Sequence, residues 1–350
     1  MNAPIGVGIV GAGPVTQAIH IPTLSRLIDR FAIHSIVDIN PAVAQSVADR
    51  CGAVVASGFD ELLADPAVEV VAICTPPFLH AEQVIQAMEA GKKAVFCEKP
   101  LATSLDEAHR IAEAADRTGV PLIVGAMHTF DPAWLAVLPV VEELATTAHT
   151  VRSSIVLPFN DRYEDLATEI IERPAPPNAG ELDAEARANL MSMAVLGLAV
   201  HDLPLVRRFM PSGEEVSVRA ADLLSPFGYA ISAESAGRTV EIVGLINAQW
   251  EPHWEFEAIS NDTILRIEFT PSFVHAGSGV ATVVHDDGTS VVHGPFGHNG
   301  YEGEWRTIHD IVSGDRRHAP KLTDLLADLD FVVALADSAA DTLRTNEVTA

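Results

Sequence analysis

The chain has 350 residues and a formal net charge of -26. This length allows a large hydrophobic core and favours two domains over one. The negative charge would repel phosphate backbones and anionic headgroups, so it argues against nucleic acid and membrane surfaces as partners.

Three further features favour a cytoplasmic protein. The cysteines Cys51, Cys74 and Cys97 are widely spaced and include no CxxC pair, so they predict neither a disulfide framework nor a thiolate metal site. The N-terminus, MNAPIGVGIVGAG, lacks the basic region and cleavage site of a signal peptide. No apolar run approaches the roughly 18 residues of a membrane-spanning helix.

The first part of the chain alternates apolar runs with helical patterns. Runs that are apolar on both faces are typical of parallel strands covered by helices. A helix from His80 to Ala90 should stop at Gly91, and Ser104 with Glu107 predicts a capping box that opens the next helix, which stops at Gly119. The predicted strands are Ile5 to Val10, Phe31 to Val37, Ala53 to Ala56, Val68 to Cys74, Ala94 to Cys97 and Leu122 to Val124.

The pattern changes after Asp131-Pro132. A helix to about Leu144, a strand near Val151 to Leu157 and a Pro-rich acidic loop, EIIERPAPPNAGELDAEA, precede an apolar helix over Ala188 to Phe209. The next runs predict neighbouring antiparallel strands with a hairpin at DDG: EVSVRA, RTVEIVGLINA, WEFEAIS, TILRIEF and VATVVHDDGTSVV. Two helical patterns close the chain, Glu304 to Val312 and Leu322 to Leu343.

A glycine-rich turn follows the first strand. Gly11, Ala12, Gly13 and Val15 lie where backbone N–H groups and a helix N-terminus can meet a pyrophosphate. Thr16 replaces the third glycine of GxGxxG, which should loosen the helix slightly against the strand. The alternative is a turn-forming glycine pair without a ligand.

Asp38 ends the second strand, 25 residues beyond Gly13, where a carboxylate can accept hydrogen bonds from an adenosine ribose. The following INPAVAQ contains no Lys or Arg to receive a 2′-phosphate, so we expect NAD as cofactor rather than NADP. The alternative is a solvated surface aspartate.

The chain resembles the Gfo/Idh/MocA family of sugar and polyol oxidoreductases over nearly its whole length. The resemblance implies a Rossmann NAD-binding domain with a doubly wound parallel sheet over residues 1–126. It also implies a substrate-binding and oligomerisation α/β domain with an open, largely antiparallel sheet over residues 127–350, and a homo-oligomer, either a dimer or a tetramer. The matching elements are the GxG turn, Thr75-Pro76 with His80, Glu98-Lys99-Pro100, and a helix carrying His201-Asp202.

For Lys99, the resemblance implies a position beside the nicotinamide and the reacting hydroxyl. An ammonium group there can donate to the substrate oxygen and stabilise a developing alkoxide. The resemblance also implies that Thr75, Pro76, His80 and Glu98 shape the cofactor pocket. A lysine at a strand end can instead be a solvated cap, and His80 can instead cap the helix that it begins.

The resemblance implies that His201 exchanges the proton of the substrate hydroxyl. Family members commonly carry an aspartate four residues earlier, on the same helical face, where this chain has Gly197. Asp202 is a poor replacement because it lies about 100° further around a helix. Gly197 therefore either admits a bulky or acidic substrate or only lets the helix pack closely, and His201 can also be a packed core histidine.

His128 follows the sixth strand where family chains often carry an aromatic residue and an arginine, so it is a candidate substrate contact or a hydrogen-bonded hinge residue. The remaining histidines show no zinc-ligand spacing, and we predict no metal. The aromatic residues Trp250, Trp254 and Phe256 predict sheet packing or a subunit interface rather than a sugar platform.

Together these patterns predict an NAD-dependent dehydrogenase or reductase that acts on the CH–OH group of a sugar, sugar acid or cyclic polyol. Lys99 would polarise the reacting oxygen, and His201 would exchange its proton. Two alternatives stay open. One is an NAD-using lyase or glycosidase-like relative that oxidises a sugar transiently, and the other is a non-enzymatic NAD-binding sensor.

Overall fold

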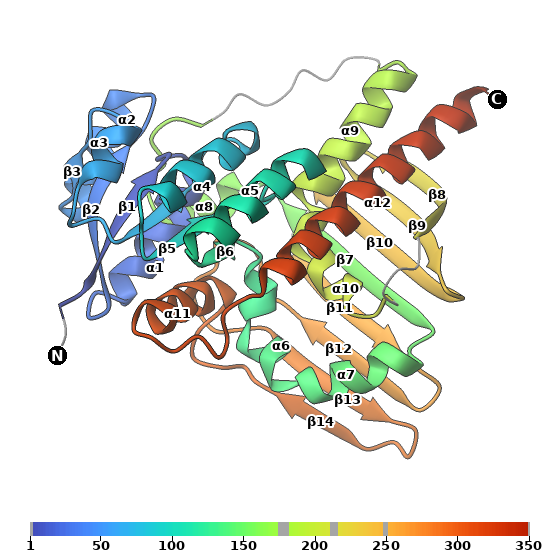
Figure 1. The fold of residues 1–350 in the computed structure, drawn as a ribbon. Coiled ribbons are helices and arrows are strands. Elements are labelled where there is room, and N and C mark those ends of the chain that lie inside the picture. The colour runs from blue at the N-terminus through green and yellow to red at the C-terminus, as the bar shows by residue number, and fades with distance from the viewer. Residues whose placement is uncertain (1–2, 174–181, 211–215, 248–250, 349–350) are drawn as a thin grey trace. The chain divides into compact units, whose positions relative to one another are not determined.

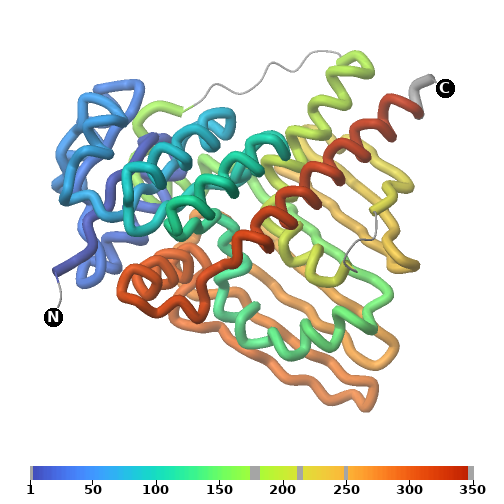
Figure 2. The backbone as a smooth tube through the Cα atoms, viewed as in Figure 1, coloured from blue at the N-terminus to red at the C-terminus, as the bar shows by residue number. Residues whose placement is uncertain are grey.

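The computed structural model describes residues 3–173, 182–210, 216–247 and 251–348. The chain forms two compact units, whose elements are labelled in Figure 1 and whose chain path can be followed in Figure 2. The first unit comprises Met1–Gly125, Tyr163–Pro176 and Tyr301–Leu329, and the second comprises Ala126–Arg162, Pro177–Gly300 and Asp330–Ala350. This division differs from the predicted ranges 1–126 and 127–350, because two later segments pack with the N-terminal strands.

The first unit contains a six-stranded sheet with the order β3-β2-β1-β4-β5-β6. All of its strand pairs are parallel, as the continuous apolar runs predicted. The strand order reverses between β1 and β4, and ligands of open α/β sheets bind at the carboxyl ends of the strands at such a point. The strands are β1 (Ile5–Val10), β2 (Phe31–Val37), β3 (Val54–Val55), β4 (Val70–Ile73), β5 (Ala94–Cys97) and β6 (Leu122–Val124).

The helices of this unit end where the sequence predicted. Gly91 and Gly119, which follow α4 and α5, have φ angles of 70° and 68°, a backbone region that favours glycine. Ser104 Oγ accepts from the Glu107 N–H at 3.3 Å, but the Glu107 carboxylate accepts from Thr103 rather than from Ser104. The helical elements are η1 (Thr16–His20), α1 (Ile21–Arg26), α2 (Pro41–Cys51), α3 (Phe59–Ala64), η2 (Pro77–Leu79), α4 (His80–Glu89) and α5 (Leu105–Thr118), with α8 (Asp161–Ala167) and α11 (Gly300–Val312) from later in the chain.

Helix α11 belongs to the core of the first unit through Trp305. The indole is fully buried and stacks on Phe96 of β5, with ring centroids 5.5 Å apart. It also meets the edge of Phe31 at 5.3 Å. The predicted helix over residues 304–312 is therefore present, but it completes the N-terminal domain rather than the C-terminal one.

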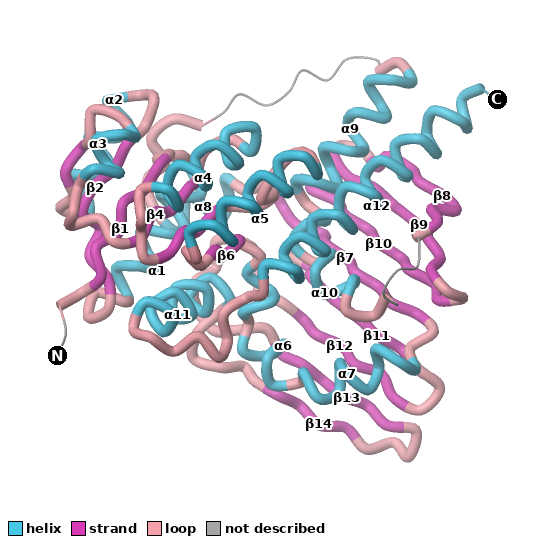
Figure 3. The backbone as a smooth tube through the Cα atoms, in the orientation of Figure 1, coloured by secondary structure: helices cyan, strands magenta, loops and turns pink. Residues whose placement is uncertain are grey.

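The second unit contains an eight-stranded open sheet with the order β14-β13-β12-β11-β7-β10-β9-β8, drawn in magenta in Figure 3. Every neighbouring pair is antiparallel except β7 with β10, which is parallel, so the prediction of a largely antiparallel open sheet is confirmed. The predicted hairpin at DDG joins β13 to β14. The strands are β7 (Thr150–Pro158), β8 (Ser217–Leu224), β9 (Phe227–Ser235), β10 (Arg238–Asn247), β11 (His253–Ile259), β12 (Thr263–Glu268), β13 (Val280–His285) and β14 (Ser290–His293).

Four helices pack on strands of this sheet. Helix α6 (Pro132–Ala136) contacts β13, α7 (Leu138–Thr147) contacts β12, α9 (Ala184–Gly197) contacts β9 and α10 (Leu203–Arg207) contacts β7. The C-terminal helix is α12 (Leu322–Val348). Trp254 and Phe256 of β11 are buried at 3% and 0% exposure, so they pack in the sheet as predicted. Trp250 lies outside the described residues. No helix in the described part of the chain is both long and apolar enough to cross a membrane.

The prediction of one apolar helix over residues 188–209 was wrong. Helix α9 ends at Gly197, a 3₁₀ turn, η4 (Ala199–His201), follows, and α10 starts at Leu203. Glycine is a poor helix residue, and Pro204 favours the first turn of a new helix because it lacks an N–H group. Gly197 and His201 therefore do not share a face of one continuous helix.

Candidate active site

The glycine turn fits a ligand that approaches its backbone closely. Gly11 has a φ angle of 90°, and a Cβ there would lie 2.6 Å from the carbonyl oxygen of Cys74, so only glycine is tolerated. A Cβ at Gly13 would meet nothing within 4 Å, so the space beside it is open. The chain turns helical directly after Gly13, with Val15 at the N-terminal flank of η1.

The structure does not fit the expectation that Thr16 loosens the helix against the strand. The residue is fully buried, and its hydroxyl donates to the Gly11 carbonyl at 2.6 Å. The side chain therefore ties the helix to the glycine turn, which a glycine at this position could not do.

Asp38 lies beside the glycine turn, as the spacing predicted. Its Oδ2 accepts from the Ala12 N–H at 2.7 Å, and its Oδ1 accepts from the Asn40 N–H at 2.8 Å. Each carboxylate oxygen has a second lone pair for a further donor. The open space at Gly13, the helix start and this carboxylate together fit the pyrophosphate and adenosine ribose of a dinucleotide.

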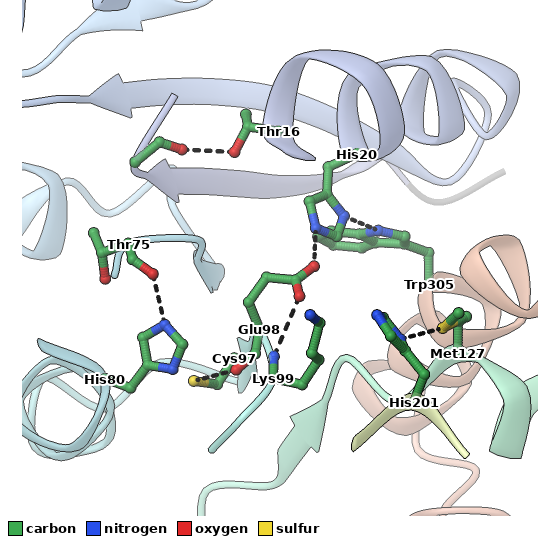
Figure 4. A network of polar contacts seen from close by, with 11 residues as sticks. Thr16, His20, Thr75, His80, Cys97, Glu98, Lys99, Met127, His201 and Trp305 are labelled. Carbon is green, nitrogen blue, oxygen red and sulfur yellow. Dashed lines mark hydrogen bonds and ion pairs between the residues drawn. The ribbon is translucent and has the colours of Figure 1, made fainter. Parts of the chain in front are cut away.

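Glu98 forms the centre of a buried polar network at the carboxyl end of β5 (Figure 4). Its Oε1 lies 2.8 Å from His20 Nε2, and its Oε2 accepts from the Lys99 N–H at 3.2 Å. Trp305 Nε1 lies 3.3 Å from His20 Nδ1. Because a carboxylate can only accept, Nε2 donates to Glu98. Burial opposes a charge on the ring, but Cys74 and Glu98 together raise the pKa of His20 well above its ordinary value.

The residues around this network shift the pKa values of Glu98 and Lys99. Burial opposes the negative charge of Glu98, but the hydrogen bond from His20, the charge of His20 and then the charge of Lys99 hold its pKa below the ordinary value. Burial also lowers the pKa of Lys99, and the Glu98 charge opposes that shift only in part. A lysine with a lowered pKa exchanges protons more readily near neutral pH.

The sequence analysis missed His20 and Trp305, which belong to this network, and Glu304, a buried acid that feels the charge of Glu98 without a hydrogen bond to it. His20 lies four residues after Thr16, and the local sequence does not show what packs against this helix. Trp305 and Glu304 lie on α11, which is remote in sequence from β5. Glu304 is 1% exposed, and neither carboxylate oxygen has a hydrogen-bond partner. Burial, and secondarily the Glu98 charge, raise the pKa of Glu304 well above its ordinary value. Ionisation of Glu304 in the folded protein is therefore less favourable than that of an exposed glutamate.

Thr75 and His80 connect two neighbouring loops at the same sheet edge (Figure 4). His80 is fully buried, and its Nε2 and Nδ1 lie 2.7 Å from the Thr75 carbonyl oxygen and 2.8 Å from that of Pro100. Thr75 Oγ1 donates to Gln83 at 2.5 Å. Pro76 is exposed. The His80 ring thus fixes the loop after β4 to the loop after β5, and it makes no helix cap.

The second unit places His201 against sulfur and an aromatic ring. Its Nδ1 lies 3.1 Å from Met127 Sδ, and its ring meets Trp254 edge-on at 5.5 Å. Since a thioether only accepts, Nδ1 donates and a neutral ring keeps Nε2 as a proton acceptor. Gly197 is exposed, and a Cβ there would meet nothing within 4 Å, so the close-packing explanation of this glycine is wrong.

Asp202 and His128 form a buried pair within the second unit. The Asp202 carboxylate is fully buried and accepts from His128 at 2.6 Å, from Ser153 at 2.6 Å and from Trp254 at 2.8 Å. His128, in η3 (Met127–Phe130), is 4% exposed and stacks on Phe269 at 3.7 Å. This geometry matches the hydrogen-bonded hinge residue among the two predicted roles of His128.

The described ranges contain no group of three or more His, Cys, Asp or Glu side chains that could hold a metal ion. Among the predicted residues, the structure groups Gly11, Ala12, Gly13 and Asp38 around the glycine turn. It also places Glu98 and Lys99 at the end of β5 and joins Thr75 to His80. The second unit holds His128, Gly197 and His201.

The fold and this edge geometry define a dinucleotide-binding Rossmann protein with a second α/β domain. The profile of the family described as "Oxidoreductase family, NAD-binding Rossmann fold" matches residues 5–126. The inositol 2-dehydrogenase of Acidothermus cellulolyticus is 30% identical over 67% of this chain and 70% of its own length. The chain belongs to this oxidoreductase family, the Gfo/Idh/MocA family.

Two further comparisons agree with this assignment. A Bacillus subtilis protein named "Uncharacterized oxidoreductase YrbE" is 31% identical over 65% of this chain, and the match spans 60% of that relative. The 3-ketoreductase KijD10 of Actinomadura kijaniata, solved as its K102A mutant with TDP-benzene and NADP, superimposes with a TM-score of 0.69 over 95% of this chain and 96% of its own. At 20% identity this likeness concerns the fold.

Replacing Glu304 by glutamine tests the protonation of the buried acid. The carboxyl is protonated in both folded and unfolded chains well below pH 4.5, the ordinary value for Glu. As the pH rises, the unfolded chain ionises first, so wild-type stability falls until the raised folded pKa is reached. The advantage of Glu304→Gln in unfolding free energy should grow by up to about 1.4 kcal/mol per pH unit. Urea unfolding from acid to neutral pH measures it.

The exposed Glu113 of α5 provides the control, since Glu113→Gln should keep a constant offset from wild type across the same range. Parallel stability curves for Glu304→Gln and wild type would show that Glu304 is ionised in the folded protein.

Proposed function

We propose that the protein is an NAD-dependent dehydrogenase or reductase acting on a CH–OH carbon of a sugar, sugar acid or cyclic polyol. The observation that carries the proposal is Lys99, whose pKa is lowered by burial and which follows the ionised Glu98 at the carboxyl edge of the sheet. The names of the relatives, an inositol 2-dehydrogenase and a 3-ketoreductase, support this class of substrate.

The bound dinucleotide supplies the hydride acceptor or donor. In this proposal, the Gly11, Ala12, Gly13 and Val15 turn holds the pyrophosphate, and Asp38 accepts from the ribose hydroxyls. The loops carrying Thr75 and Pro76 and the Glu98-Lys99 pair border the nicotinamide end, with His80 fixing the two loops to each other.

Lys99 and His201 carry the proton chemistry. The Lys99 ammonium donates to the reacting oxygen and stabilises the alkoxide that develops as the hydroxyl proton leaves, and loss of hydride from the carbon then leaves a carbonyl. His201 accepts the hydroxyl proton at Nε2, because its Nδ1 donates to Met127. His128 donates to Asp202, the residue after His201, so we assign it to holding the turn that carries His201 rather than to contact with substrate.

We also propose NAD rather than NADP, since Asp38 lies at the end of β2 and residues 39–45 contain no Lys or Arg. Ile39, directly after Asp38, is fully exposed and offers an apolar surface to an adenine ring. We further propose a homo-oligomer, a dimer or tetramer, formed through the open sheet of the second unit. Light scattering of the purified chain measures its size.

A panel of inositols, aldoses and sugar acids, assayed with NAD and NADP side by side, tests the function. We expect net NADH formation with at least one neutral or acidic polyol. Substrate conversion without net NADH would favour a lyase with transient oxidation, and dinucleotide binding without any turnover would favour a sensor.

Replacing Lys99 by alanine should reduce turnover far more than it weakens NAD binding. Loss of a positioned acid or base costs about 10²- to 10⁴-fold in rate. The matched control is Lys93→Ala, because Lys93 precedes the same strand but is 56% exposed and pairs with Glu69. Steady-state kinetics and NADH fluorescence titration separate the two effects. Near-normal turnover of Lys99→Ala would assign Lys99 a structural role.

Replacing Asp38 by alanine should weaken NAD binding by about 1–3 kcal/mol, the range for losing hydrogen bonds to a charged acceptor. Calorimetric titration with NAD and NADP measures the change and the preference together. Tighter binding of NADP than NAD by the unmodified protein would contradict the assigned role of Asp38.

Replacing Gly197 by aspartate tests the substrate class. The site has open space, so the variant should fold with little change in melting temperature. A new carboxylate should lower kcat/KM for an acidic sugar at least about tenfold more than for a neutral sugar of similar size, because of like-charge repulsion. An equal loss of kcat/KM for both substrates would show that Gly197 does not select substrates by charge or size.

A further inference from the structure

A segment remote in sequence lies against the glycine turn within the first unit. Residues 168–173, which we call the strap, follow α8. Arg50 of α2 holds the start of the strap, donating to Thr168 Oγ1 at 3.2 Å and to the Glu169 carbonyl at 2.8 Å. The strap therefore attaches to the helix that follows Asp38 in the chain.

Gln17 attaches the middle of the strap to the glycine turn. This side chain is 1% exposed, and its amide pairs with both backbone groups of Ile171, accepting from the N–H at 2.9 Å and donating to the carbonyl at 3.1 Å. The same amide donates to the Ala12 carbonyl at 2.8 Å and accepts from Arg50 at 2.8 Å. A buried amide with this many partners fixes the position of Ile171 firmly.

Glu172 completes a closed circuit, by which we mean a ring of hydrogen bonds that joins the strap, the glycine turn and the loop after β2. Its Oε2 accepts from Asn40 Nδ2 at 2.5 Å, and the Asn40 backbone N–H donates to Asp38. Asp38 accepts from Ala12, whose carbonyl binds Gln17, and Gln17 binds Ile171, the neighbour of Glu172.

The Glu172 backbone is left-handed, with a φ angle of 65°. Such a conformation is strained for a residue other than glycine and persists where the surroundings enforce it.

Two carboxylates thus accept from Asn40, Asp38 from its backbone N–H and Glu172 from its side-chain amide, at the sheet edge where the proposed function puts an adenosine ribose. The neighbouring Arg173 does not offset them fully, because it pairs with Glu164 and Asp165. A 2′-phosphate would bring further negative charge to this position, whereas a 2′-hydroxyl can donate to a carboxylate.

We propose that Glu172 is a second specificity-determining residue of the cofactor site, which acts with Asp38 to disfavour a 2′-phosphorylated dinucleotide. This inference rests on the proposed function, since it requires that a nicotinamide dinucleotide binds at the glycine turn. It adds a determinant that lies 134 residues after Asp38 in the chain and that the β2 loop alone does not contain.

The test compares Glu172→Gln with Glu169→Gln. Both variants remove one negative charge from the exposed strap, but only Glu172 contacts Asn40. A glutamine at position 172 can still accept from Asn40, so the strap should stay in place. Fluorescence titration with NADH and NADPH gives dissociation constants for each protein at low and high salt, independent of any substrate.

We expect Glu172→Gln to strengthen NADPH binding roughly two- to tenfold, the scale of exposed charge interactions, with little change for NADH. The gain should shrink as salt rises, and Glu169→Gln should show a clearly smaller one. Equal behaviour of the two variants would overturn the role of Glu172 while leaving NAD binding intact. Failure of the unmodified protein to bind either dinucleotide would overturn the proposed function and this inference together.

Discussion

The Glu98 carboxylate brings a negative charge into the interior of the first unit, and the surrounding residues are arranged around that charge. His20 donates to one oxygen and the Lys99 N–H to the other. A Cβ at Gly125 would come within 3.2 Å of the same carboxylate, so the chain leaves the sheet through a glycine there. Trp305 closes the cluster from a segment some 200 residues later in the chain. An unpaired buried carboxylate would be costly, so these contacts hold the Lys99 backbone in place.

The two ends of the sheet edge use charge in different ways. At the end of β5, the Glu98 carboxylate, whose pKa is held below its ordinary value, precedes Lys99, whose pKa is lowered by burial, and this suits a group that must give and take a proton. At the end of β2, the carboxylates of Asp38 and Glu172 are exposed enough to face solvent or a ligand, which suits recognition. In both places a residue from later in the chain takes part, Trp305 beside the end of β5 and Glu172 beside the end of β2.

The sequence predicted the strands of the first unit closely, because strands covered on both faces are continuous apolar runs bounded by turn residues. It also placed Asp38 beside the glycine turn, since strand and loop lengths fix that register. It could not predict that Trp305 and Ile171 return to this unit, because local periodicity does not indicate which sheet an amphipathic segment covers. The strand over residues 227–235 was missed because small and polar residues dilute its alternation. The break after Gly197 is hidden by the apolar pattern, which continues to Phe209 although Gly197 ends one helix and Pro204 lies in the first turn of the next.

Deuterium transfer tests hydride transfer most directly. The protein is incubated with NAD and a polyol deuterated at its carbinol carbons, and the cofactor is analysed by mass spectrometry and NMR. For an oxidoreductase of this kind, we expect deuterium at C4 of the nicotinamide in NADH that accumulates together with the ketone. Consumption of the polyol without deuterated NADH, or reduced cofactor that carries no deuterium, would contradict direct hydride transfer from the substrate carbon.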